Sequence, residues 1–191
     1  MIVLGCNIDS ILLNRLETSF RFIEQTLSNN VCFISNHLTD FDTHNSNYNH
    51  HITWFLSGGI KNNFKGVKSE ASILKYQIDN SISLKYQDVV SDKIKWDFVL
   101  DEKSTNTAEN FIWASYFLNT STQIFDNIYV VTSDFHFTRA SQMLKIIDSS
   151  RNFKWILGNM EEKDSRYWEN IHIQNVESDV AKARIKLQAL M

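Results

Sequence analysis

Five short apolar segments recur along the chain, and they constrain its fold more than any other feature. The segments are Ile2–Gly5, Thr53–Leu56, Trp96–Leu100, Ile128–Thr132 and Phe153–Leu157. Most are continuously apolar rather than alternating, which is typical of strands buried on both faces of a parallel sheet. Helical patterns separate them, as in right-handed strand–helix–strand crossovers. The sequence therefore predicts an α/β fold, a three-layer sandwich with a mainly parallel sheet of about five strands.

The segments between these strands have the apolar spacing of amphipathic helices. Residues 11–27 place Leu12, Leu16 and Phe20 on one helical face. We expect three further helices over 69–78, 106–118 and 138–147, with candidate N-caps Ser69, Asn106 and Thr138. In the second of these, Glu109 lies three residues after Asn106, which is the spacing of a capping box.

The chain length favours one domain spanning residues 1–191. The strand–helix rhythm breaks at 31–51, where the polar run "THNSNYNHH" indicates a surface loop or insertion, and "VCFIS" at 31–35 is a candidate extra strand. Residues 158–191 have a mostly helical pattern. We expect its packing positions to be Trp168, Ile171, Val176, Val180 and Leu187.

Charge and composition narrow the class of protein. The net charge of −3 argues against general nucleic-acid binding, because such proteins usually carry a basic surface. No apolar stretch is long enough for a membrane span, and no basic and apolar leader opens the chain. Two cysteines do not make a disulfide framework. We therefore expect a soluble, cytoplasmic protein, while the sequence leaves its oligomeric state open.

Polar residues follow four of the predicted strands. Because the carboxyl ends of parallel strands meet at one edge of a sheet, these residues should line the crevice where ligands bind in such folds. If the strand order is 3-2-1-4-5, the order reverses beside the first strand. The residues after the strands are Gly5, Cys6 and Asn7; Ser57, Gly58 and Gly59; Asp101, Ser104 and Thr107; and Ser133, His136 and Arg139.

The chemistry of this edge fits a small anionic ligand. Arg139 can bind a phosphate or carboxylate through two N–H groups, and the backbone at Gly58 and Gly59 can approach a ligand closely. His136 can act as an acid or base near neutral pH. Asp101 or Glu109 could orient these groups or supply oxygen ligands to a divalent cation.

Each of these features also has a plainer interpretation. The glycine pair can be a tight turn, and Glu109 can serve only the helix cap. Asp134 can be the partner of Arg139, and Cys6 a small buried residue. The histidines His44, His50 and His51 lack the spacing of a zinc site, so we assign no metal ligands. The convergence of four segments on one edge favours a site over any single motif.

The order of the motifs "LSGG", "SEA", "D-x-x-S-T-N-T-A-E-N" and "V-T-S-x-x-H-x-x-R-A" resembles the family called domain of unknown function 218, from residue 3 to residue 140. This family includes soluble YdcF-like proteins and anchored envelope proteins similar to SanA and ElyC. The chain resembles the soluble branch, although the family usually has Glu at the position of Asp101. The resemblance assigns signature positions to Gly5, Arg15, Ser57, Gly58, Gly59, Ser69, Glu70, Asp101, Ser104, Thr107, Glu109, Asn110, Thr132, Ser133, His136 and Arg139.

The resemblance implies a Rossmann-like fold and leaves three functions open. The first is hydrolysis or group transfer on a phosphate-bearing small molecule, with His136, Asp101 and Glu109 as catalytic residues. The second is binding of S-adenosylmethionine, with or without methyl transfer, which rests on the resemblance alone because no G-x-G-x-x-G follows the first strand. The third is a non-catalytic binding or regulatory module, since no nucleophile with an evident base stands out in the sequence.

Overall fold

The computed structural model of the chain describes residues 1–5, 9–30, 50–60, 68–82, 85–86 and 94–189. Within these residues, five strands form one parallel sheet of order β3-β2-β1-β4-β5. The elements in chain order are β1 (Ile2–Leu4), α1 (Asp9–Asn30), β2 (His50–Ser57), α2 (Glu70–Gln77), the π-helical turn η1 (Ile78–Ile82), β3 (Ile94–Asp101), α4 (Thr107–Thr120), β4 (Ile128–Ser133), α5 (Asp134–Ile147), β5 (Phe153–Gly158), α6 (Ser165–His172), the 3-10 turn η2 (Ile173–Asn175) and α7 (Val176–Gln188).

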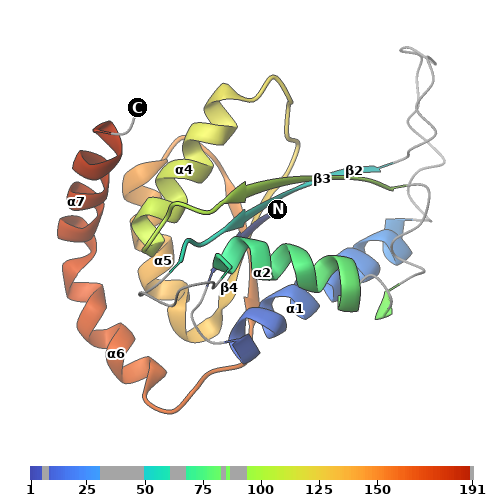
Figure 1. The fold of residues 1–191 in the computed structure, drawn as a ribbon, viewed down its shortest axis with the longest axis horizontal. Coiled ribbons are helices and arrows are strands. Elements are labelled where there is room, and N and C mark those ends of the chain that lie inside the picture. The colour runs from blue at the N-terminus through green and yellow to red at the C-terminus, as the bar shows by residue number, and fades with distance from the viewer. Residues whose placement is uncertain (6–8, 31–49, 61–67, 83–84, 87–93, 190–191) are drawn as a thin grey trace.

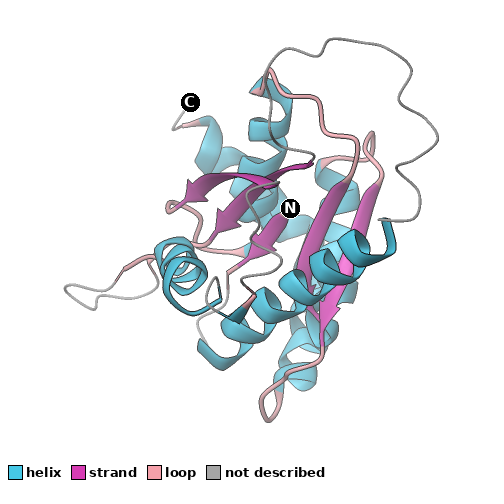
Figure 2. Ribbon diagram, turned by 90° about the vertical axis from the view of Figure 1, so that its right-hand side faces the viewer, coloured by secondary structure: helices cyan, strands magenta, loops and turns pink. Residues whose placement is uncertain are grey.

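The sheet confirms the predicted parallel α/β sandwich and the predicted strand order. All five predicted strands are present, and β1 lies between β2 and β4 (Figure 2). In its register, Leu4 pairs with Ser57 and Val3 pairs with Val131. Because the order reverses at β1, the carboxyl ends of β1 and β4 border the crevice where ligands bind in folds of this kind.

Helices cover both faces of the sheet, and each face has its own apolar core (Figure 1). On one face, Val3, Trp54 and Leu56 pack with α1 and α2. On the other face, Leu4 and Val130 pack with α4, α5 and α7. Successive strand residues point to opposite faces, so continuous apolar runs are required to fill both cores.

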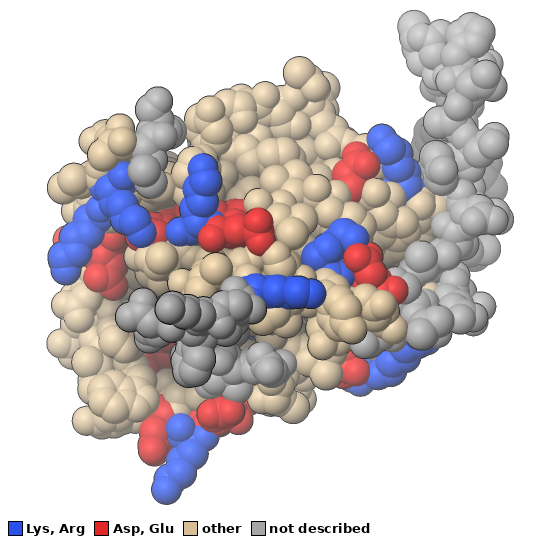
Figure 3. Space-filling model, in the orientation of Figure 1, with Lys and Arg blue, Asp and Glu red and all other residues tan. Residues whose placement is uncertain are grey.

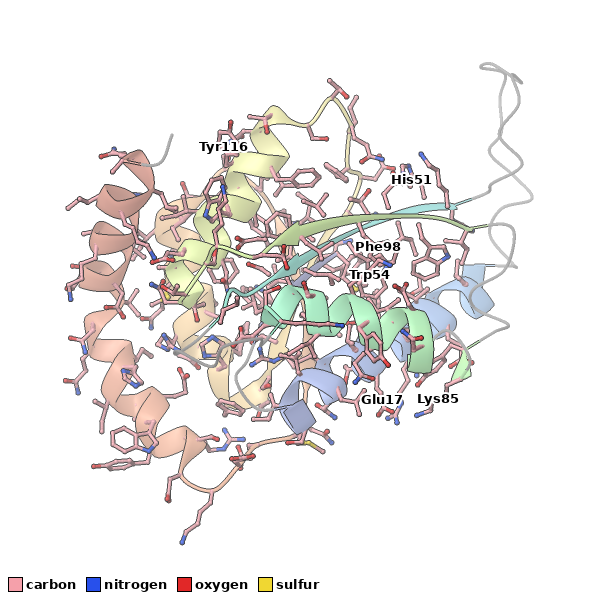
Figure 4. All side chains as sticks on the ribbon, viewed as in Figure 1. Glu17, His51, Trp54, Lys85, Phe98 and Tyr116 are labelled. Carbon is pink, nitrogen blue, oxygen red and sulfur yellow. The ribbon has the colours of Figure 1, made fainter. Side chains whose placement is uncertain are left out.

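Stacked aromatic rings fill the first core. The ring centroids of Phe20 and Trp54 lie 5.2 Å apart, and those of Trp54 and Trp96 lie 5.7 Å apart. Figure 4 shows Trp54 and Phe98 between α2 and the sheet, and their centroids are 6.4 Å apart. Each such pair adds about 0.5–1.5 kcal/mol to the stabilisation from burial.

The structure corrects several predicted details. Strand β2 begins at His50, so His50 and His51 belong to the sheet rather than to the polar loop, and they pair with Ile94 and Lys95. Residues 31–49 lie outside the described residues, and they include the candidate extra strand at 31–35. Helix α5 begins at Asp134, directly after β4, because Ser133 is its extended N-cap and an acidic residue suits the first turn.

The C-terminal helices follow the outside of α5 and α4 (Figure 1). Val176, Val180 and Leu187 of α7 are buried as predicted. Trp168 and Ile171 are instead exposed, and no residue of α6 is fully buried. We call residues 165–188 the C-terminal arm. It contacts α5 through polar side chains of α6, and it packs against α4 and α5 through apolar side chains of α7.

In Figure 3, basic side chains (blue) and acidic side chains (red) lie next to one another on the described part of the surface. Positive side chains there stand beside acidic ones rather than in one continuous area. Of the helices in the described residues, none combines the length and apolar character that a membrane span requires.

Candidate functional site

His136 lies at the carboxyl edge of the sheet with a polar contact at each ring nitrogen. It is the third residue of α5, and the absence of a loop between β4 and α5 fixes its position. Its Nδ1 lies 2.8 Å from Glu169 Oε1, and its Nε2 lies 3.2 Å from Thr107 Oγ1. Three elements therefore converge here, since Glu169 belongs to α6 and Thr107 is the first residue of α4.

Arg139 binds the same carboxylate through two N–H groups. Its Nε donates to Glu169 Oε2 at 2.6 Å, and its Nη2 donates to Glu169 Oε1 at 2.9 Å. Residues three apart share one face of a helix, which brings Arg139 beside His136. The three side chains are largely buried, with exposed fractions of 15% for Arg139, 14% for Glu169 and 7% for His136.

Burial sets the charge states of this group. Burial lowers the pKa of His136 to about 4, although the contact with Glu169 opposes the change. Burial alone would raise the pKa of Glu169, but hydrogen bonds from His136 and Arg139 outweigh it and lower that pKa to about 2. At neutral pH the pair is therefore a neutral imidazole and a carboxylate.

The hydrogen-bond geometry then assigns the proton on the imidazole. Nδ1 faces two groups, Glu169 Oε1 at 2.8 Å and the donor Arg139 Nη2 at 3.2 Å. An ionised carboxylate only accepts, and its contact is the shorter of the two, so we place the proton on Nδ1, facing Glu169. Nε2 is left with its lone pair toward Thr107, whose hydroxyl can donate to it. This orientation suits a base that removes a proton at Nε2.

Asp101, a predicted catalytic residue, organises the ends of β2 and β3. It accepts hydrogen bonds from Ser57 Oγ at 2.6 Å, from Ser104 Oγ, and from the N–H groups of Lys103 and Ser104. The carboxylate that contacts His136 is Glu169, rather than the expected Asp101 or Glu109.

Glu109 closes the start of α4. Its carboxylate accepts from the N–H of Thr105 at 2.8 Å, from Asn106 Nδ2 at 2.8 Å and from Lys186 Nζ at 2.8 Å. Burial opposes ionisation, but these partners outweigh it and lower the pKa of Glu109. The predicted Asn106 cap is present, with Oδ1 accepting from the N–H of Glu109. The Glu109 carboxylate accepts from the backbone N–H of Thr105, whereas in a capping box it would accept from that of Asn106. Asn110, another expected ligand contact, is buried, and its Oδ1 has no hydrogen-bond partner among the described residues.

The backbone amides of Gly58 and Gly59 are already hydrogen-bonded, so they do not form the expected open cradle. The N–H of Gly58 donates to the carbonyl of Asp101, and that of Gly59 donates to the carbonyl of Ser104. A Cβ on Gly59 would lie 2.6 Å from that Ser104 oxygen, which explains the glycine. Gly58 has φ of +145°, in the region that favours glycine, and it lies against the Glu70 side chain, as Gly5 does.

Arg15 of α1 links the carboxyl ends of β1 and β4. Its buried guanidinium donates to the carbonyls of Leu4 at 2.7 Å and Gly5 at 2.9 Å, and to Ser133 Oγ at 3.0 Å. Ser133 is the N-cap of α5, yet its side chain makes no cap hydrogen bond because it faces Arg15.

Ser69 has a capping role at α2 as predicted. Its Oγ accepts from the N–H of Ser72 and donates to Glu102 Oε1 at 2.5 Å. Hydrogen bonds from Ser69 and Ser72 lower the pKa of Glu102. Asn7 lies outside the described residues. Within the described part of the chain, no three His, Cys, Asp or Glu side chains form a group that could hold a metal ion.

The predicted site residues therefore separate into four groups along one edge. His136 and Arg139 bind Glu169, and Thr107 contacts His136. Asp101 accepts from Ser57 and Ser104, Arg15 joins Gly5 to Ser133, and Glu109 pairs with Lys186. The sequence reasoning missed Glu169 and Lys186, which both come from the C-terminal arm. The sequence predicted an anionic ligand for Arg139, with Asp134 as the alternative partner. In the structure Arg139 binds Glu169, and Asp134 pairs with Arg166.

A comparison with known family models, curated proteins and solved structures finds no match for this chain, so its resemblance to domain of unknown function 218 remains a prediction.

Proposed function

We propose that the chain binds a small phosphate-bearing ligand at the carboxyl edge of its sheet and catalyses phosphoester hydrolysis or group transfer. The observation that carries the proposal is the line of contacts Glu169–His136–Thr107, with 2.8 Å and 3.2 Å between the facing atoms. A neutral imidazole held by a carboxylate can accept a proton at its other ring nitrogen, and after taking that proton it can act as a general acid.

The start of α4 supplies the complementary groups for a phosphate. The first N–H groups of a helix have no carbonyl partner within that helix, and they carry the positive end of its dipole. In α4 the N–H of Glu109 is bonded to Asn106, while the N–H groups of Thr107 and Ala108 belong to the same first turn. A phosphate at this position would lie beside His136 Nε2.

Arg139 takes a different role from the one the sequence indicated. Because Nε and Nη2 both bind Glu169, Arg139 holds the carboxylate that orients His136. It is therefore a positioning residue, and the dipole of α4 would offset the ligand charge. Phosphoryl transfer depends mainly on such positioning and charge stabilisation.

The test combines binding with turnover. We would measure thermal shifts with inorganic phosphate, nucleoside monophosphates, sugar phosphates and S-adenosylmethionine, and then hydrolysis of p-nitrophenyl phosphate. A ligand at 100 times its Kd adds about 2.7 kcal/mol to stability, which gives a clear shift. His136→Asn should keep the shift and lose roughly 10²–10⁴-fold in turnover.

His51→Asn is the matched control, because His51 contacts a carboxylate at the amino end of β2, at the opposite edge of the sheet (Figure 4). It should keep both binding and turnover. Turnover that survives in His136→Asn would contradict the proposed role of the imidazole. A thermal shift from S-adenosylmethionine alone would replace the phosphate ligand with that molecule.

A further inference from the structure

We propose that Thr107 is the nucleophile of this site and that the reaction passes through a phosphothreonine intermediate. This inference rests on the proposed function and assigns a covalent role to a residue expected only to bind the ligand. It starts from the hydroxyl that faces the free ring nitrogen of His136.

The hydroxyl groups at this edge differ sharply in what they contact. Those of Ser57 and Ser104 donate to Asp101, and that of Ser133 accepts from Arg15. Among the described hydroxyl groups at this edge, Thr107 alone lies at hydrogen-bond distance from an imidazole nitrogen. The sequence could not reveal this pairing, because 29 positions separate Thr107 from His136.

Thr107 is not required for capping α4. Asn106 caps the helix through Oδ1, and Thr105 contacts Glu109 and Lys186. Thr107 is half-buried rather than fully enclosed. A hydroxyl with a base at hydrogen-bond distance, and an orienting carboxylate behind that base, is the arrangement that activates weak oxygen nucleophiles.

The reaction balances with water as the only co-substrate. Thr107 Oγ bonds to phosphorus while its proton moves to His136 Nε2, and the bond from phosphorus to the leaving oxygen breaks. The leaving oxygen lies on the far side of phosphorus in an in-line displacement and takes a proton from solvent. Water then bonds to phosphorus from that side and gives a proton to solvent, the bond from phosphorus to Thr107 Oγ breaks, and Oγ recovers its proton from Nε2. An acceptor alcohol in place of water would give group transfer.

Charge in both steps develops on the phosphoryl oxygens and on the imidazole. The first turn of α4 offers N–H groups and a helix dipole to the phosphoryl oxygens, since Thr107 is its first residue. The Glu169 carboxylate stabilises the imidazolium through Nδ1. Each group that the chemistry needs is therefore adjacent to Thr107 Oγ or to the ring that serves it.

The experiment uses two reagents and three variants of the full chain. p-Nitrophenyl phosphate measures turnover, and an alkyl fluorophosphonate labels an activated hydroxyl with loss of fluoride. Thr107→Val removes the hydroxyl at nearly constant shape, Thr107→Ser restores a hydroxyl, and Thr105→Val is the neighbouring control. Thermal melts establish that each variant is folded.

We expect Thr107→Val to lose roughly 10²-fold or more in turnover, while Thr107→Ser and Thr105→Val retain activity within about tenfold of the parent chain. Peptide mass mapping should find the phosphonyl group on Thr107 in the parent chain. It should find no such label in His136→Asn, because the base is needed for the attack.

The two proposals fail in different ways. If Thr107→Val turns over like the parent chain and the label is absent from Thr107, a water molecule attacks directly and the nucleophile is overturned, while the role of His136 stands. If the parent chain neither hydrolyses p-nitrophenyl phosphate nor reacts with the fluorophosphonate, the proposed function and this inference fall together.

Discussion

Acidification should destabilise this protein through His136. Burial lowers the pKa of His136 from 6.5 to about 4, so between these values the unfolded chain binds a proton that the folded chain does not. Stability must then fall as the pH drops through this window. One pH unit corresponds to about 1.4 kcal/mol for one proton, so the loss between about pH 7 and about pH 4 is about 3 kcal/mol.

Urea denaturation of the parent chain and of His136→Asn, at steps between about pH 7 and about pH 4, isolates this effect because most other titrations cancel in the difference. Glu169 interferes little with this measurement. Its pKa is about 2 in the folded chain and 4.5 ordinarily, so the stability that its carboxylate contributes is lost mainly below pH 4.5. If the free energies of unfolding of the parent chain and of His136→Asn changed equally with pH, the reasoning would be refuted. A parent chain that gains stability relative to the variant would show that the Glu169 charge outweighs burial and raises the pKa of His136.

Three further substitutions test the contacts around the site. Asp101→Asn should cost about 2–3 kcal/mol in urea denaturation, because two hydroxyls and two N–H groups donate to this carboxylate; a neutral result would remove its organising role. Gly59→Ala should lower the free energy of unfolding by about 1–3 kcal/mol, because the new Cβ meets a backbone oxygen. Gly158→Ala should lower it less, because the Cβ there meets a side-chain oxygen. Equal melting temperatures of the two variants would contradict this. Lys186→Met should lower the free energy of unfolding by about 1–2 kcal/mol, because it leaves the buried Glu109 carboxylate without its cation. The loss is limited because Lys186 is half-exposed to solvent. An unchanged free energy of unfolding would show that the N–H groups of Thr105 and Asn106 are enough to stabilise the carboxylate.

The sheet could be predicted because its determinants are local. A continuous apolar run of four residues, such as Ile128–Val131, is too short for a helix and indicates a buried strand when helical patterns flank it. The caps at Ser69 and Asn106 were predicted for the same reason, since a cap depends on residues within one turn. The start of α5 was misplaced because no Gly or Pro separates it from β4, so the pattern gave no boundary before Thr138.

The site was only partly predictable because its partners are distant in sequence. Parallel topology places Thr107 and His136 at one edge, but it does not say which side chains touch. The glycines illustrate the same limit. They were expected to approach a ligand, but Gly59 approaches the segment after β3, and its N–H is bonded there.

Glu169 and Lys186 show why the C-terminal arm belongs to the site. Glu169 holds His136 and Arg139 at the start of α5, and Lys186 holds Glu109 at the start of α4. The arm therefore positions both helix N-termini between which Thr107 and the imidazole meet. An apolar pattern predicts that such an arm packs, and the buried residues of α7 do pack, but the two polar contacts depend on single charged residues that no periodicity singles out. The contact between Thr107 and His136 is in this way supported by residues more than thirty positions after the strands that precede their helices.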